Sequence, residues 1–316
     1  MSFVAAQIAS LVEDIRLLEA LVTGPLGLHS DIRMLRQSMP FPEAADLPHD
    51  EARKRRLVYG NLSDRPAQLA IRTVAHIASS LAVLEAVTDA ARSPIGPEWP
   101  ARARRVLARA EQKVASDLRS GTVSRLRGLC VIVDPETTGE RPPAQVAEAV
   151  LQGGAAVVQL RDKSGDHGRI LESAREIRSM CDGHDALFIM SDDPAIALIS
   201  DAHGLHLGRH VLPVPEARRV LASAQIVGRS NNSLDEVAGS QAEGVDYLVV
   251  GVKMVAKVKQ TTSQPVVATG GIGPDNVADV VRAGAECVCV VSAVTQAADP
   301  EAATTTLAEA IAKARA

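Results

Sequence analysis

From residue 129 onward the chain alternates short apolar runs with helix-like segments, and no other feature constrains its fold as strongly. The runs are rich in β-branched residues and bounded by turn signals, so each is predicted to form a buried parallel strand. Eight strand–helix units in about 190 residues are typical of a compact (β/α)8 barrel. The runs are Leu129–Val133, Ala156–Leu160, Ala186–Met190, Gly204–Leu207, Gln225–Gly228, Tyr247–Val250, Val266–Ala268 and Cys287–Val291.

An open doubly wound sheet is the alternative architecture for such an alternation. A dinucleotide-binding fold of that class carries its glycine fingerprint directly after the first strand. Here the paired glycines, Gly270 and Gly271, come after the seventh run. The barrel is therefore the favoured fold.

The first 125 residues follow a different rhythm, with apolar residues at three- to four-residue spacing. This spacing predicts a small all-α domain at residues 1–125, followed by the barrel at residues 126–316. Stretches rich in proline and glycine at 24–27, 39–48 and 93–97 are expected to separate its helices. The periodic residues are Ile8, Leu11, Val12, Ile15, Leu18, Leu21, Val22, Leu69, Ile71, Val74, Ile77, Leu81, Leu84 and Val87.

Composition indicates which kinds of partner the chain can bind and in which cellular compartment it is expected. Aromatic residues make up 2% of the chain, too few for the base stacking that nucleic-acid binding uses. No run of eighteen apolar residues occurs, so no membrane span is expected. The four cysteines form no C-x-x-C pair and no export signal precedes them, which predicts reduced thiols in a cytoplasmic protein. A homo-oligomer or a protein partner bound through the N-terminal helices is left open.

Two turns late in the chain predict a phosphate site. One apolar run ends on Gly270 and Gly271, and the other ends on Val291 before Ser292. Paired glycines let the backbone approach a ligand, and a helix start after Ser292 can offer free N–H groups. In a (β/α)8 barrel the turns after strands 7 and 8 are the usual phosphate site. A small phosphorylated molecule is the expected ligand; the alternative is that the glycines only pack a helix against the sheet.

Polar residues also follow the second strand. Gln159, Arg161 and Lys163 alternate along it and can point the same way. Two cations and an amide suit a diphosphate or another polyanion. The alternative is a salt-bridged loop with no ligand.

The third and sixth strand ends carry further candidates. Asp192 can hold a hard cation such as Mg²⁺ beside substrate phosphates, whereas Asp193 before Pro194 is expected to cap the next helix. In the basic segment after the sixth strand, Lys257 or Lys259 can meet a phosphate.

Two other groups of side chains are expected to be structural. His203, His206 and His210 straddle one strand and cannot all face the same end, so His206 is interpreted as a packed barrel residue. Cys287 and Cys289 share a face of the eighth strand and can lie near Cys130 if the barrel closes.

Taken in order, these strand ends resemble the thiamine-phosphate synthase and thiazole tautomerase superfamily, over nearly all of residues 128–314. The helical part resembles the accessory domain of some longer members. The matching segments are Val158–Lys163, Phe188–Asp193, Asp201–Gly208, Val227–Ser230, Gly244–Gly251, Val266–Ile272 and Val291–Val294.

The resemblance implies a transferase that ionises a pyrimidine diphosphate with Mg²⁺, after which a thiazole phosphate captures the cation. By position it implies diphosphate contacts from Gln159, Arg161, Lys163, Ser230 and Lys259. It implies Asp192 as a Mg²⁺ ligand, with Ser191 beside it in the substrate site. It implies that the thiazole phosphate binds Gly270, Gly271, Val291 and Ser292.

Several positions depart from the family pattern. Ser191 stands where the family has Asn, and Val211 stands at the second Mg²⁺ carboxylate. The Thr-x-Thr-Lys loop has become Ala256–Lys259, and Asn232 occupies the place of the tautomerase acid–base His. The leading interpretation is a thiamine phosphate synthase-like transferase. The alternative is a catalytically silent or divergent member that binds a phosphorylated ligand or a partner protein.

Overall fold

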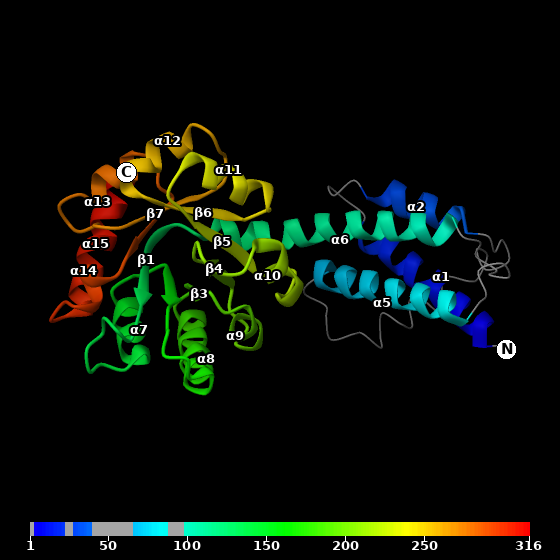
Figure 1. Ribbon diagram of the computed structural model, residues 1–316, viewed down its shortest axis with the longest axis horizontal. Helices are drawn as coiled ribbons and strands as arrows, with labels where there is room; N and C mark the ends of the chain where they lie inside the picture. The colour runs from blue at the N-terminus through cyan, green and yellow to red at the C-terminus, as the bar shows by residue number, and fades with distance from the viewer. Residues whose placement is uncertain (1–2, 23–27, 40–65, 88–97) are drawn as a thin grey trace. The chain divides into compact units, whose positions relative to one another are not determined.

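The computed structural model describes residues 3–22, 28–39, 66–87 and 98–316 (Figure 1). The chain divides into two compact units, Met1–Leu118 and Arg119–Ala316. The boundary predicted at residues 125/126 directly follows helix α6 (Glu98–Ser124). The loops predicted at 24–27 and 93–97, and all of 39–48 except Met39, lie outside the described residues.

Helices make up the described part of the first unit, which confirms a helical region ahead of the barrel. They are α1 (Phe3–Leu21), α2 (His29–Gln37), α5 (Pro66–Val87) and the larger part of α6. Apolar side chains at the predicted spacing meet in one core. Its fully buried members include Leu11, Ile15, Leu18, Ile32, Leu35, Ile77 and Leu81.

Helix α5 holds the window Leu69–Ala86, which is long and apolar enough to cross a membrane by length and composition alone. Its mean hydropathy is 1.4, and 44% of the window is buried inside the structure. Leu69, Ile77 and Leu81 of this window belong to the buried core. Core packing therefore accounts for the apolar side of α5.

The second unit is a closed parallel barrel in which each strand pairs with its neighbour in sequence and β8 pairs with β1. Closure confirms the barrel and rules out the open sheet. The last pair in the ring aligns Cys130 with Cys289 and Gly128 with Cys287. The strands are β1 (Gly128–Val133), β2 (Val157–Leu160), β3 (Leu187–Ser191), β4 (Gly204–Leu207), β5 (Ile226–Asn231), β6 (Tyr247–Gly251), β7 (Val266–Thr269) and β8 (Cys287–Val290).

Helices follow the strands and lie outside the barrel (Figure 1). Asp193 caps α9 as predicted, because its Oδ1 accepts a hydrogen bond of 2.9 Å from the Ile196 N–H. The segments are α7 (Pro143–Gln152), α8 (His167–Gly183), α9 (Pro194–Ile199), α10 (Val214–Val220), α11 (Leu234–Ala242), the 3-10 turn η1 (Val252–Met254), α12 (Val255–Lys259), α13 (Val277–Arg282), α14 (Ser292–Thr295) and α15 (Pro300–Arg315).

Alternate strand residues divide the barrel into an outer and an inner core. Outward residues such as Val131 and Val158 pack under the helices. Inward residues form a separate cluster that includes Ile132 and Tyr247. The Tyr247 ring fits because β5 carries Gly228 opposite it: a Cβ at Gly228 would lie 2.0 Å from Tyr247 Cε2.

The segment Arg119–Leu126 contacts the amino ends of the strands through a hydrogen-bonded ion pair and apolar packing. Arg119 Nε donates to Asp246 Oδ1 at 2.9 Å, and Arg218 donates to the other oxygen of this carboxylate. Asp246 directly precedes β6. Leu126 is 3% exposed and packs against the inner cluster, so it closes the barrel at this end.

The crossover from β6 to β7 is short, and it places Lys259 elsewhere than the sequence predicted. Its helix α12 buries Val255 and Val258 against the outside of the barrel. Lys259, at the end of α12, reaches Glu286 Oε1 with its Nζ at 2.6 Å. Glu286 precedes β8, and its other oxygen accepts from Val266 N, so this ion pair lies at the amino ends of β7 and β8. The structure therefore does not place Lys259 at the carboxyl ends, where a diphosphate contact was expected.

Candidate functional site

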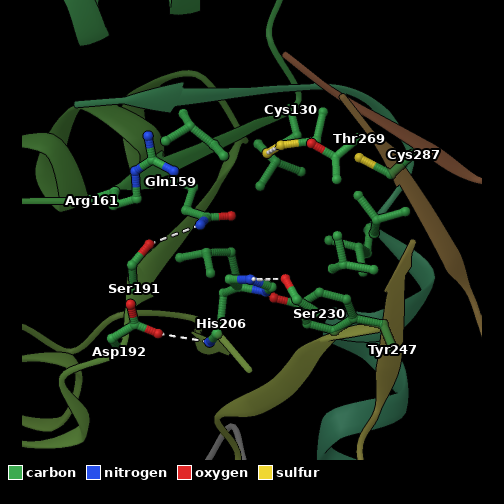
Figure 2. A pocket seen from close by; sticks show the side chains of 18 of the residues that line it. Cys130, Gln159, Arg161, Ser191, Asp192, His206, Ser230, Tyr247, Thr269 and Cys287 are labelled. Carbon is green, nitrogen blue, oxygen red and sulfur yellow. Dashed lines mark hydrogen bonds between the residues drawn. The ribbon is translucent and has the colours of Figure 1, made fainter. Parts of the chain in front are cut away.

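A cavity of about 260 Å³ occupies the interior of the barrel. It extends from Leu126 at the amino end to Lys163 and Asp192, which follow β2 and β3 at the carboxyl end. Figure 2 shows Arg161, Gln159, Ser191 and Asp192 on one side, and Cys130 and Cys287 with Thr269 on the other. The lining residues are Leu126, Cys130, Ile132, Val157, Gln159, Arg161, Lys163, Ile189, Ser191, Asp192, His206, Gly208, Ser230, Tyr247, Val249, Val267, Thr269, Cys287 and Cys289.

Arg161 is held at the rim of this cavity by a buried acid. Its Nε donates to Asp134 Oδ2 at 2.7 Å, and the Asp134 side chain is 1% exposed. Asp134 directly follows β1, and Arg161 directly follows the neighbouring β2. Because the carboxylate engages Nε, the guanidinium keeps a defined orientation at the cavity.

Gln159 and Ser191 form a second pair, between β2 and β3. Gln159 Nε2 donates to Ser191 Oγ at 2.8 Å, and both residues are buried (Figure 2). The departure from the family's Asn at residue 191 is therefore accommodated by a hydroxyl that accepts from this amide. Its own proton remains available to a ligand.

His206 and Ser230 form a third pair, between β4 and β5. His206 Nε2 lies 3.0 Å from Ser230 Oγ, while its Nδ1 is buried and has no hydrogen-bond partner in the described structure. Burial lowers the pKa of His206 to about 4, so the imidazole is neutral at neutral pH. His206 was expected only to pack inside the barrel, and its hydrogen bond with Ser230 was not predicted.

Asp192 adopts a left-handed conformation, with φ of 62°, directly after β3. Its Oδ1 accepts from Gly208 N at 2.7 Å, and its own N–H donates to the His206 carbonyl. A non-glycine residue in this region is uncommon and carries strain. The two backbone contacts hold the carboxylate at the wall of the cavity.

The side chains present fit a metal ion only in part. Within the described ranges, no group of three or more His, Cys, Asp or Glu side chains is arranged to hold one. Val211, at the position of the expected second carboxylate, offers no ligand. Asp192 alone suits an ion such as Mg²⁺ only when substrate oxygens complete its shell.

The predicted phosphate turns follow β7 and β8. Gly270 and Gly271 have φ of 91° and 64°, and a Cβ on either would meet open space. These two glycines and Ser292 are exposed, and Asn276 Nδ2 donates to the Gly271 carbonyl at 2.8 Å. The positive φ values explain why glycine is used in this turn.

Three thiols form part of the inner wall. Cys130 and Cys289 place their sulfur atoms 3.5 Å apart, as β1–β8 pairing requires, and all four cysteines are free. Hydrogen bonding with the Cys287 and Cys289 thiols, together with burial, raises the pKa of Cys130 well above its usual range. The sulfur atoms therefore act as apolar surface.

The structure brings most of the sequence-predicted residues together. Gln159, Arg161, Lys163, Ser191, Asp192 and Ser230 line the same cavity, whereas the predicted phosphate-binding residues Gly270, Gly271, Val291 and Ser292 are not part of its lining. Asp134 was not predicted, although it follows β1 just as the other polar residues follow their strands. That shared position could have identified it.

Comparisons with known proteins agree with this geometry. A sequence profile described as Thiamine monophosphate synthase matches residues 129–264 and 249–294. A thiamine-phosphate synthase of Thioalkalivibrio sulfidiphilus is 41% identical over 197 residues, covering 57% of this chain and 93% of the relative. One from Anaeromyxobacter dehalogenans is 40% identical over 204 residues, covering 60% and 89%. The solved thiamine phosphate pyrophosphorylase of Pyrococcus furiosus is 30% identical, with a TM-score of 0.58 over 62% of this chain and 100% of that one.

Proposed function

Because the chain belongs to the thiamine monophosphate synthase family, we propose that its barrel joins a pyrimidine diphosphate to a thiazole phosphate as a transferase of thiamine biosynthesis. The observation that carries the proposal is a cavity with a cationic rim at β2, whose lining includes Thr269, the β7 residue directly before the exposed Gly270 and Gly271. The C–O bond to the diphosphate breaks, the thiazole nitrogen bonds to the same carbon, and pyrophosphate leaves. The nitrogen becomes the positively charged thiazolium, and no proton moves.

Arg161 and Lys163 are assigned to the leaving group. Charge develops on the diphosphate oxygens as the C–O bond breaks, and fixed cations stabilise that charge. Arg161 is oriented by Asp134 before substrate arrives. Gln159 and Ser191, paired at 2.8 Å, are assigned to polar contacts deeper in the same cavity.

The thiazole phosphate is assigned to Gly270, Gly271, Val291 and Ser292. Gly270, Gly271 and Ser292 are exposed, and both glycines have open space around them, which suits a phosphate because it needs several donors at close approach. Ser230, on the far wall and paired with His206, is assigned to the pyrimidine side of the cavity.

Mg²⁺ is assigned to Asp192 together with diphosphate oxygens. When bound there, the ion would supply positive charge to the leaving group. Removing Mg²⁺ with EDTA is expected to lower the rate of thiamine phosphate formation at least about tenfold. A rate unchanged by EDTA would reject this assignment.

The test of function is an assay with both substrates and Mg²⁺, with thiamine phosphate read by thiochrome fluorescence. Asp192→Asn is expected to lower the rate about 100-fold, because a neutral amide binds Mg²⁺ poorly. Asp193→Asn is the matched control, since Asn caps α9 as well as Asp does, and its rate should stay within about twofold. No product from the wild-type chain would favour a silent family member.

The two candidate lysines give a second test. Lys163→Met is expected to raise the KM for the pyrimidine diphosphate about tenfold, because it removes a charge at the cavity rim. Lys259→Met should leave that KM within about twofold, because its partner Glu286 lies at the amino ends of the strands. If both changes raised this KM equally, the result would support Lys259 as a diphosphate-binding residue.

A cytoplasmic location remains a prediction from the sequence. An oligomer or a partner bound through the N-terminal helices remains one too.

A further inference from the structure

One turn lies between the two strand ends to which the diphosphate and the thiazole phosphate are assigned. Strand β1 stands between β2 and β8 in the barrel, and Asp134 begins the turn that follows it. The Asp134 carbonyl accepts from the N–H groups of Thr137 and Thr138 at 2.8 and 3.2 Å. The Asp134 Oδ1 accepts from Glu136 N at 3.0 Å, which completes a compact, hydrogen-bonded turn.

Toward β2, this turn holds Arg161. The second carboxylate oxygen of Asp134 accepts from Arg161 Nε at 2.7 Å. Asp134 is 1% exposed, whereas the Arg161 side chain is 35% exposed and lines the cavity. A buried carboxylate fixed by its own turn thus sets the direction of a partly exposed guanidinium.

Toward β8, the same turn holds the segment that begins at Val291. The Thr295 hydroxyl lies 3.0 Å from Thr137 Oγ1 and 3.2 Å from the Val291 carbonyl, and can donate to either. Thr295 is fully buried. Arg141 reinforces this side: its Nη2 donates to the Thr295 carbonyl at 2.5 Å and its Nη1 to the Ala297 carbonyl at 3.1 Å.

We propose that Asp134 and Thr295 are positioning residues, one for each anion-binding edge, and that both are anchored on the turn Asp134–Thr138. Asp134 orients Arg161 for the diphosphate, and Thr295 holds Val291 and Ser292 for the thiazole phosphate. The inference rests on the proposed function for the identity of the two anions. Neither residue needs to touch substrate.

The test uses the full chain and separates the two edges. Asp134→Asn can keep one oxygen as the acceptor for Glu136 N, and its NH2 group, a donor, then faces Arg161 Nε. It is expected to raise the KM for the pyrimidine diphosphate and the Kd for inorganic pyrophosphate about tenfold, while the KM for the thiazole phosphate stays within about twofold. The Asp134→Ser side chain is too short to reach Arg161 and should give the same result. This variant replaces Asp134→Asn in the test if Asp134→Asn does not fold.

Thr295→Val keeps the shape and removes the hydroxyl. It is expected to raise the KM for the thiazole phosphate about tenfold and to leave pyrophosphate binding unchanged. Thr295→Ser should restore the wild-type value. Thr304→Val is the matched control, because Thr304 is equally buried but its hydroxyl bonds to the Pro300 carbonyl within α15.

Purely structural roles would change both KM values together, and that result would overturn the inference. Equal KM and Kd values in the wild-type chain and the variants would overturn it too while leaving the reaction intact. Pyrophosphate titration needs no turnover. An inactive wild-type chain that still binds pyrophosphate more tightly than Asp134→Asn would therefore keep the role of Asp134 and reject only the reaction.

Discussion

Replacing Arg161 by methionine is expected to lower kcat/KM for thiamine phosphate formation about 100- to 1000-fold. Methionine keeps the apolar stem but offers no donor to the departing diphosphate. The change also leaves Asp134, which is 1% exposed, without its cation, so a loss of stability accompanies the loss of rate. The double variant Arg161→Met with Asp134→Asn removes that buried charge and should recover stability without recovering activity.

Steady-state kinetics with each substrate varied in turn, together with thermal melting, would separate these effects. Arg169→Met is the matched control, because Arg169 pairs with Asp166 on an exposed part of α8, with 85% of its side chain accessible. A surface pair of this kind contributes little, and the control should keep kcat/KM within about twofold. An Arg161→Met variant as active as this control would remove Arg161 from the mechanism.

Replacing Gly228 by alanine is expected to destabilise the barrel by about 3 kcal/mol or more. The added Cβ would lie 2.0 Å from Tyr247 Cε2, within the interior of a closed ring of strands. Tyr247 is 3% exposed, so its ring has little room to move away. The expected result is a large drop in melting temperature or a chain that accumulates as insoluble protein.

Gly239→Ala is the matched control for this change. Gly239 lies within α11, and a Cβ there would meet no atom within 4 Å. Alanine should therefore keep or raise the stability, by up to about 1 kcal/mol. Adding Tyr247→Leu to Gly228→Ala should recover part of the lost stability, because the smaller side chain vacates the space. A Gly228→Ala variant that melts with the wild type would contradict the packing described for the barrel interior.

The fold could be predicted from the sequence because its strands are buried on both faces. Leu129–Val133 and Cys287–Val291 are continuous apolar runs, and such runs are found in parallel strands covered by helices. The alternating positions also predicted the proximity of Cys130 and Cys289, since closure pairs β1 with β8. Gln159 and Arg161 could be placed for the same reason, because strand ends converge at one end of a barrel.

Other parts of the site could not be predicted, because they depend on which group a side chain reaches. Lys259 matches a family position, yet a short crossover ends in a helix whose buried valines face the barrel, and the lysine extends to Glu286. The position of Asp134 after β1 could have marked it as a candidate, but its pairing with Arg161, 27 residues away, could not be predicted. His206 was expected to pack. Its hydrogen bond with Ser230 was not foreseen, because it depends on the register of β4 against β5, which aligns His206 with Gly228.

Because Arg119–Leu126 closes the barrel at its amino end, this segment determines where a fragment containing only the barrel should begin. A fragment starting at Gly128 would contain every strand but lack Leu126, so water would enter the cavity from its floor. It would also leave Asp246 with Arg218 but without Arg119. A barrel fragment should therefore begin upstream of Arg119, inside α6, and its first residues are as much part of the barrel as the strands are.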